Sequence, residues 1–256
     1  MKFIHTSDWH IGRQLHNQSL LDDQRHVLLQ IVEIAKEHAV DALIIAGDIY
    51  DRSVPPANAV ALLDEVLNTL VNELKITVIM IAGNHDGHER LGFASRQMQD
   101  SGLFIVGPLS AALTPIEVNG KRGAAVFYPL PYADPATVRH VFECEVSSHE
   151  EAMVKLLEQV SEHDAKGLPK VVISHCFLDG GSESDSERPI SIGGADKISP
   201  RLFSDFNYTA LGHLHGPQYK GTEHTRYSGS PLKYSFSEQQ QKKSVTLVEL
   251  DTAGKA

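Results

Sequence analysis

Side chains that commonly bind metal ions follow five short apolar segments of this sequence. Aspartate, asparagine and histidine supply the oxygen and nitrogen ligands of catalytic divalent cations. A single ion that keeps an open position for chemistry needs fewer ligands than this sequence offers, whereas two ions that share one carboxylate would use all of them. The sequence therefore predicts a two-metal centre, with these candidate ligands: Asp8, His10, Asp48, Asn84, His175, His213 and His215.

Two features of spacing indicate how these ligands are arranged. Gly47 precedes Asp48, and a glycine allows the tight turn that would bring this carboxylate between two ions, so Asp48 is the predicted shared ligand. The candidates also include an Asp-x-His pair and a His-x-His pair. In an extended segment, this spacing directs both side chains of a pair to the same face.

The charge of this ligand set favours a phosphate ester as substrate. Two divalent cations carry more positive charge than Asp8, Asp48 and a bridging hydroxide can neutralise, and Asn84 adds only a neutral oxygen. The surplus would stabilise the charge that develops on phosphate oxygens during in-line displacement. The leaving oxygen then needs a proton, and His85, which adjoins Asn84, is the predicted general acid. Asp51 is predicted to orient and charge that imidazole, as a carboxylate does for a catalytic histidine.

The elements that would position these residues form an α/β pattern. The runs 3–7, 42–46, 78–82, 171–174 and 209–211 are rich in apolar residues with little polar alternation, which is typical of strands covered on both faces. In α/β proteins, sites gather where the carboxyl ends of such strands open into loops. Helical periodicity predicts helices over 20–37, 57–74 and 150–160, and further strands are expected at 103–106 and 244–250. These strand–helix–strand units predict parallel pairing.

The motifs Asp-x-His, Gly-Asp-x-x-Asp, Gly-Asn-His-Asp, a single histidine and Gly-His-x-His together resemble those of the calcineurin-like metallophosphoesterases. The resemblance implies an α/β fold, a four-layer α-β-β-α sandwich, as a single nuclease-type domain over residues 1–256. It also implies how the ligands divide: Asp8, His10, Asp48 and His215 around the first ion, and Asp48, Asn84, His175 and His213 around the second. His85 and Asp51 would be the proton-transfer pair.

A narrower similarity links the stretches 5–13, 83–91, 183–190 and 227–232 to the bacterial SbcD exonucleases. It implies cleavage of DNA, as an exonuclease on duplex ends and an endonuclease on single strands or hairpins, in DNA repair, recombination and replication. Manganese is the implied metal, with magnesium, iron and zinc as alternatives. The implied partners are DNA, an SbcC-like coiled-coil ATPase and a second nuclease subunit in a homodimer. Because the sequence ends at Ala256, the capping and partner-binding segments of that family are expected to be absent.

Two alternative functions are compatible with the same residues. The first is hydrolysis of cyclic nucleotides or other small phosphoesters at the same centre. The second is a non-catalytic subunit that binds DNA ends, which would have lost ligands, although no motif position is missing here. The net charge of −10 predicts weak, salt-sensitive DNA binding by the isolated domain, since phosphate recognition relies on clustered lysine and arginine.

The remaining composition is that of an ordinary globular protein, with 41% hydrophobic and 22% charged residues. Neither a leader nor an apolar stretch of membrane-spanning length is apparent, and two cysteines are too few for a disulfide framework, so a cytoplasmic protein is expected. His5, Trp9 and Cys176 are expected to pack in the interior. The stretch 180–194 is predicted to be a long loop, either functional or disordered, with its acidic residues 183–187 in solvent or at a dimer or DNA cleft.

Overall fold

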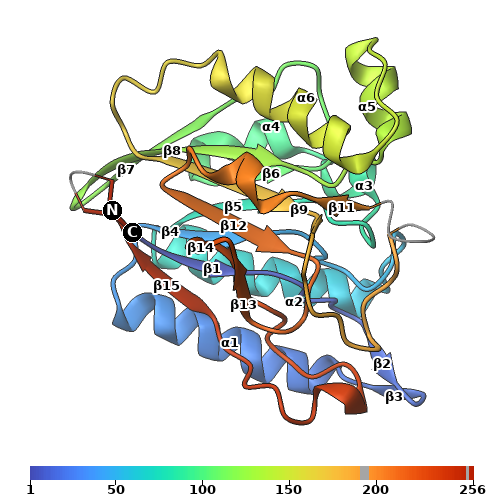
Figure 1. Ribbon diagram of the computed structural model, residues 1–256. Helices are drawn as coiled ribbons and strands as arrows, with labels where there is room; N and C mark the ends of the chain where they lie inside the picture. The colour runs from blue at the N-terminus through green and yellow to red at the C-terminus, as the bar shows by residue number, and fades with distance from the viewer. Residues whose placement is uncertain (191–195, 252–253) are drawn as a thin grey trace.

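The computed structural model describes residues 1–190, 196–251 and 254–256. Two β-sheets pack face to face, with helices α1 and α2 on the outer face of one sheet and α5 and α6 on the outer face of the other (Figure 1). The predicted four-layer α-β-β-α sandwich is therefore confirmed. The N- and C-termini lie together at one edge of the sandwich (Figure 1).

The first sheet carries three of the predicted motif strands. Its order is β15-β1-β4-β5-β6, in which β15 runs antiparallel to β1 and the other neighbours are parallel, as predicted for the strand–helix–strand units. The strand expected at 103–106 is β6, which pairs with β5 at the edge. The bounds are β1 (Lys2–Thr6), β4 (Ala42–Ile45), β5 (Thr77–Ile81), β6 (Leu103–Val106) and β15 (Thr246–Glu249).

The second sheet carries the other two motif strands at its centre. Its order is β13-β14-β12-β9-β8-β7, with the neighbours from β14 to β8 parallel and both edge strands antiparallel. The bounds are β7 (Ile116–Gly120), β8 (Gly123–Leu130), β9 (Lys170–His175), β12 (Tyr208–Gly212), β13 (Gln218–Lys220) and β14 (Thr222–Tyr227).

Three of the outer helices, α1, α2 and α6, match the predicted ranges closely, whereas α5 was not predicted. Helix α2 continues into a π-helical turn, η1, so that together they cover 57–73 of the predicted range 57–74. The side chains of Asp134 and Ser148 cap α5 and α6 by accepting main-chain N–H groups, which satisfies donors that a helix start leaves free. The bounds are α1 (Leu21–Glu37), α2 (Ala57–Leu67), η1 (Asn68–Glu73), α5 (Pro135–Phe142) and α6 (His149–Ser161).

Short elements connect these layers around the loops. They are β2 (Gln14–Leu15), β3 (Gln18–Ser19), α3 (His88–Leu91), α4 (Ser95–Met98), η2 (Gln99–Ser101), β10 (Phe177–Leu178), β11 (Lys197–Ile198), η3 (Pro200–Phe203) and η4 (Phe236–Glu238). The predicted long loop 180–194 lies between β10 and β11, and its residues 191–194 are outside the described part of the chain.

The core lies in three layers that explain the apolar strand runs. Along β1 and β4, Phe3 and Ile44 face the space between the sheets, whereas Ile4 and Leu43 pack under α1 and α2. Successive side chains of a strand point to opposite faces, so a strand covered on both faces needs apolar residues at every position. In the part of the chain that the structure describes, no helix is both long and apolar enough to cross a membrane.

Candidate metal centre

The predicted site residues lie at the carboxyl ends of β1, β4, β5, β9 and β12; His175 is the last residue of β9, and the others lie on the loops that follow their strands. Several of these residues have left-handed main-chain conformations that are rare outside glycine, with φ of 54° at Asp8, 44° at His10, 51° at Asp48 and 109° at His213. Main-chain hydrogen bonds from Asp8 N–H to the Gly47 carbonyl and from His10 N–H to the Asp48 carbonyl, both 3.0 Å, hold the first two loops together. Such conformations cost free energy and gather at functional sites.

Two glycines allow the loops to approach each other closely. Gly47 has a φ of 91°, which confirms the predicted tight turn before Asp48. A Cβ atom at Gly47 would lie 2.3 Å from Nδ1 of His175, and one at Gly83 would lie 2.1 Å from Oδ1 of Asp48. Any larger residue at these positions would therefore displace a candidate ligand.

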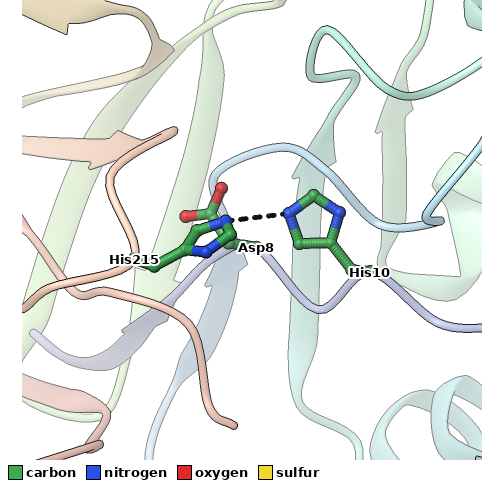
Figure 2. A group of neighbouring side chains, drawn as sticks. All are labelled: Asp8, His10 and His215. Carbon is green, nitrogen blue, oxygen red and sulfur yellow. Dashed lines mark hydrogen bonds between the residues drawn. The ribbon is translucent and has the colours of Figure 1, made fainter. Parts of the chain in front are cut away.

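The first group of ligand atoms belongs to Asp8, His10 and His215, which are all buried (Figure 2). These atoms lie within 4.8 Å of one another, and the two Nε2 atoms of the histidines are 3.1 Å apart. The Asp8 carboxylate accepts hydrogen bonds from Ser7 Oγ at 2.5 Å and from the His213 main-chain N–H at 3.0 Å. The carboxylate is thereby fixed beside both rings.

The second group contains Asp8, Asp48 and His175, again with ligand atoms within 4.8 Å of one another. Oδ2 of Asp48 lies 3.6 Å from Nε2 of His10 and 3.5 Å from Nε2 of His175. Asp48 therefore lies beside a histidine of each group, as expected of a shared ligand, and Asp8 belongs to both groups. Oδ1 of Asn84 lies 2.9 Å from Nε2 of His175.

His213 lies beside this second group. Its ring centroid is 5.5 Å from that of His175, and its side chain is buried. All seven predicted ligands thus line one region, in which the ring of His175 neighbours that of His213 and the ring of His10 neighbours that of His215.

His85 and Asp51 are neighbours, but they interact through a different atom from the one predicted. Nδ1 of His85 lies 2.9 Å from the main-chain carbonyl oxygen of Asp51, while the Asp51 carboxylate pairs with Arg13 at 3.1 Å. A carbonyl oxygen only accepts, so Nδ1 of His85 carries the hydrogen and Nε2 remains for proton transfer. The Asp51 carboxylate pairs with Arg13, and one of its oxygens also lies within 4.8 Å of ring nitrogens of His85 and His10. That this carboxylate orients and charges the imidazole of His85 stays a prediction.

Comparison with known proteins identifies the family. A sequence model described as calcineurin-like phosphoesterase matches residues 1–217. The chain belongs to the calcineurin-like phosphoesterase family.

Two solved structures have a similar fold. The TT1561 protein of Thermus thermophilus is 14% identical, with a TM-score of 0.53, and the match covers 90% of this chain and 89% of that one. A dimetal phosphatase from Danio rerio is 12% identical, with a TM-score of 0.51, and the match covers 89% of this chain and 86% of that one. At these identities the similarity concerns the fold alone.

Burial shapes the charges in the centre of this calcineurin-like phosphoesterase. It raises the pKa of Asp8 to about 6 and lowers the pKa of His10 and of His213 well below the usual value. Burial also opposes a charge on His175, but the adjacent Asp48 outweighs it and raises the pKa of His175 to about 9. Neutral imidazoles and ionised carboxylates are the forms that bind metal ions.

The residues of the site fit divalent cations. Four imidazoles and two carboxylates bring their polar atoms together in a buried region, where charges need partners. Nδ1 of His10 is buried with no hydrogen-bond partner among the described residues. Mixed imidazole and carboxylate donors suit manganese, iron and zinc. When bound, such ions polarise phosphate oxygens and lower the pKa of bound water.

A supporting carboxylate, Asp86, was not predicted. It is buried and accepts main-chain N–H groups of Ile49 at 3.1 Å, Tyr50 at 2.9 Å and Gly83 at 2.9 Å, so it ties the loop after β4 to the loop after β5. Its place in the Gly-Asn-His-Asp motif was the available signal. Ser186, which contacts His215, lies in the SbcD-like stretch 183–190, whereas Glu238, which contacts Ser186, had no signal in the sequence.

Proposed function

We propose that this calcineurin-like phosphoesterase is a DNA nuclease that depends on two divalent metal ions. The choice of DNA as the substrate rests on one observation. The four stretches that resemble SbcD exonucleases are far apart in the sequence, yet all of them contribute to the metal centre. Stretch 5–13 supplies Asp8 and His10, and stretch 83–91 supplies Asn84 and His85. The other two support the ligands: Ser186 Oγ lies 2.6 Å from Nδ1 of His215, and Ser228 Oγ lies 2.9 Å from Ser7 Oγ.

The proposed ligand division follows the two groups of side chains. The first ion would be held by Asp8, His10, Asp48 and His215, and the second by Asp48, Asn84, His175 and His213. Such a pair of ions would supply an activated water and would stabilise charge on the phosphate. Manganese is the proposed metal by the similarity to SbcD, and the mixed imidazole and oxygen donors are compatible with it.

His85 is the proposed general acid for the leaving oxygen. Its Nδ1–H donates to the Asp51 carbonyl, which fixes the ring, and its main-chain N–H donates to Oδ1 of Asp48 at 2.9 Å, which holds the loop to the centre. The ring is half-buried, with its centroid 4.6 Å from that of His10. Nε2 is thereby the atom that donates a proton to the departing strand end.

Partner binding extends the proposal. By its similarity to SbcD, the domain would act as a homodimer with an SbcC-like coiled-coil ATPase in the cytoplasm. Static light scattering tests the dimer, and co-purification with such an ATPase tests the complex. A strictly monomeric, unassociated protein would contradict this part alone.

The experiment is digestion of hairpin and linear duplex DNA in the presence of manganese, alongside bis(p-nitrophenyl) phosphate and cyclic nucleotides. We expect faster cleavage of DNA, activity that is lost on chelation, and strong inhibition by salt because backbone contacts are electrostatic. The His85→Ala variant is the control for contaminating nucleases.

A small-molecule phosphodiesterase or phosphatase is the second candidate, and the net charge of −10 favours it. A polyanion such as DNA is repelled by an acidic protein more strongly than a small phosphoester is. Faster turnover of cyclic nucleotides than of hairpin DNA would replace the nuclease proposal with this one. Metal-dependent hydrolysis is common to both.

A further inference from the structure

His215 is held by neighbours at its main-chain N–H, at its carbonyl and at Nδ1 of its ring. Its main-chain N–H donates to the Glu187 carboxylate at 2.7 Å, and its carbonyl accepts from the Lys243 ammonium at 2.8 Å. Nδ1 of the ring lies 2.6 Å from Ser186 Oγ. The remaining atom, Nε2, faces His10 in the metal centre (Figure 2).

The group behind Ser186 is a buried carboxylate. Glu238 is fully buried, pairs with the Lys243 ammonium and accepts hydrogen bonds from Ser186 Oγ and, at 3.2 Å, from the Tyr234 main-chain N–H. An unpaired charge in this position would be strongly destabilising, so Lys243 keeps Glu238 in its ionised form. Lys243 also donates to the His215 carbonyl, so the same ammonium group contacts both Glu238 and His215.

The hydrogens of this chain can be assigned from the donors available. A carboxylate only accepts, so the single hydroxyl hydrogen of Ser186 points to Glu238. Ser186 Oγ then offers only a lone pair to His215, and Nδ1 of the ring must carry a hydrogen to make the 2.6 Å contact. Nε2 consequently has no hydrogen, and its lone pair points at His10 and the metal centre.

We propose that Ser186 and Glu238 are positioning residues that hold His215 in the Nδ1–H tautomer, so that Nε2 is always free to bind a divalent cation. Within the stretch 183–187, Ser186 and Glu187 then support the ligand, whereas Glu183 and Asp185 are exposed, as expected of a solvated loop. Buried partners of metal-binding histidines commonly act in this way. The inference rests on the metal centre of the proposed function, but not on DNA as the substrate.

The test uses the Ser186→Ala variant, with Ser182→Ala as the matched control, because Ser182 is a serine of the same loop outside this chain of contacts. Histidine-labelled, metal-free protein is examined by long-range proton–nitrogen NMR, with the His215 signal assigned by comparison with His215→Gln. We expect the Nδ1–H tautomer in the wild-type protein and a shift toward the Nε2–H tautomer in Ser186→Ala. Titration with manganese should show affinity for one ion reduced by about 10- to 100-fold, with the other ion unaffected.

Glu238→Gln provides an independent variant of nearly equal size. The amide can donate to Ser186, which would reverse the hydroxyl and place the hydrogen of His215 on Nε2, so the same tautomer shift is expected. Wild-type His215 in the Nε2–H form, or Ser186→Ala with unchanged tautomer and unchanged manganese affinity, would overturn the inference. Equal weakening of both ions would also contradict it. None of these measurements depends on cleavage of DNA, so the role of Ser186 and Glu238 can be tested even if the nuclease assay fails.

Discussion

Replacing Gly47 by alanine should damage the metal centre more than the fold. Two effects act on this variant. The first is the left-handed conformation, with φ of 91°, which costs an L-residue about 1–2 kcal/mol, partly offset by about 0.4–1 kcal/mol from the stiffer unfolded chain. The second is steric, because the new Cβ would lie 2.3 Å from Nδ1 and 2.8 Å from Cγ of His175.

Gly102 separates these two effects, because it has the same φ of 91° but its nearest neighbours to a new Cβ are atoms of Thr77 at 3.9 Å. Gly102→Ala should therefore lower the free energy of unfolding by roughly 1 kcal/mol through the backbone effect alone. Gly47→Ala should lose about 1–3 kcal/mol more, the usual cost of overpacking. Only Gly47→Ala should move the His175 ring away from Asp48 and the Ala46 carbonyl, which Nδ1 now contacts at 2.9 Å.

The assay combines urea unfolding with manganese titration of both variants. We expect Gly102→Ala to bind two ions like the wild-type protein, and Gly47→Ala to lose about 10- to 100-fold in affinity for at least one of them, as when the support of a ligand is removed. Wild-type metal binding by Gly47→Ala would refute the placement of His175 against this turn. Equal metal loss in both variants would attribute the effect to backbone strain instead.

Three further results are expected. Asp48→Asn should weaken occupancy by both ions in metal analysis, and loss of only one ion would exclude a shared ligand. His85→Ala should slow phosphodiester cleavage by about 10²–10⁴-fold while both ions still bind, whereas loss of metal would make His85 a ligand. Burial lowers the pKa of His5 to about 3, so the unfolded chain takes up a proton below pH 6.5 that the folded protein does not, and stability falls as the pH falls toward 3. Between pH 7.5 and 5.5 this effect lowers the free energy of unfolding by about 1.4 kcal/mol. The difference in that free energy between the wild-type protein and His5→Gln, measured by urea unfolding, should shrink by the same amount over this pH range. An unchanged difference would show that His5 is not buried in its neutral form.

The motif strands could be predicted because their burial on both faces leaves a continuous apolar run. The other strands of the second sheet could not, and β14 illustrates why. Its sequence from Thr222 to Tyr227 is mostly polar and charged, and only Thr225 and Tyr227 are buried. Its place in the sheet is determined by pairing with β12 rather than by its own composition.

Among the site residues too, some could be predicted from the sequence and others could not. Ligands at strand ends were visible in the sequence because their motifs are short and their order is fixed. The partner of His85 was not, because the choice between the carbonyl and the carboxylate of Asp51 depends on a loop conformation set by Arg13. Glu238 reaches the centre through Ser186 from a segment 52 residues away, and no local pattern indicates that contact.

The ligands come from both sheets, and this has a consequence for the whole centre. Asp8 and Asp48 follow strands of the first sheet, whereas His175 and His215 lie at the ends of strands of the second. The distance between Asp48 and His175 is therefore set by how the sheets pack. That packing is a layer of close apolar contacts, such as the edge-to-face contact of Phe3 and Phe127 with centroids 5.5 Å apart. Since close-packed cores deform little, the same apolar runs that form the fold also fix the spacing of the ligands.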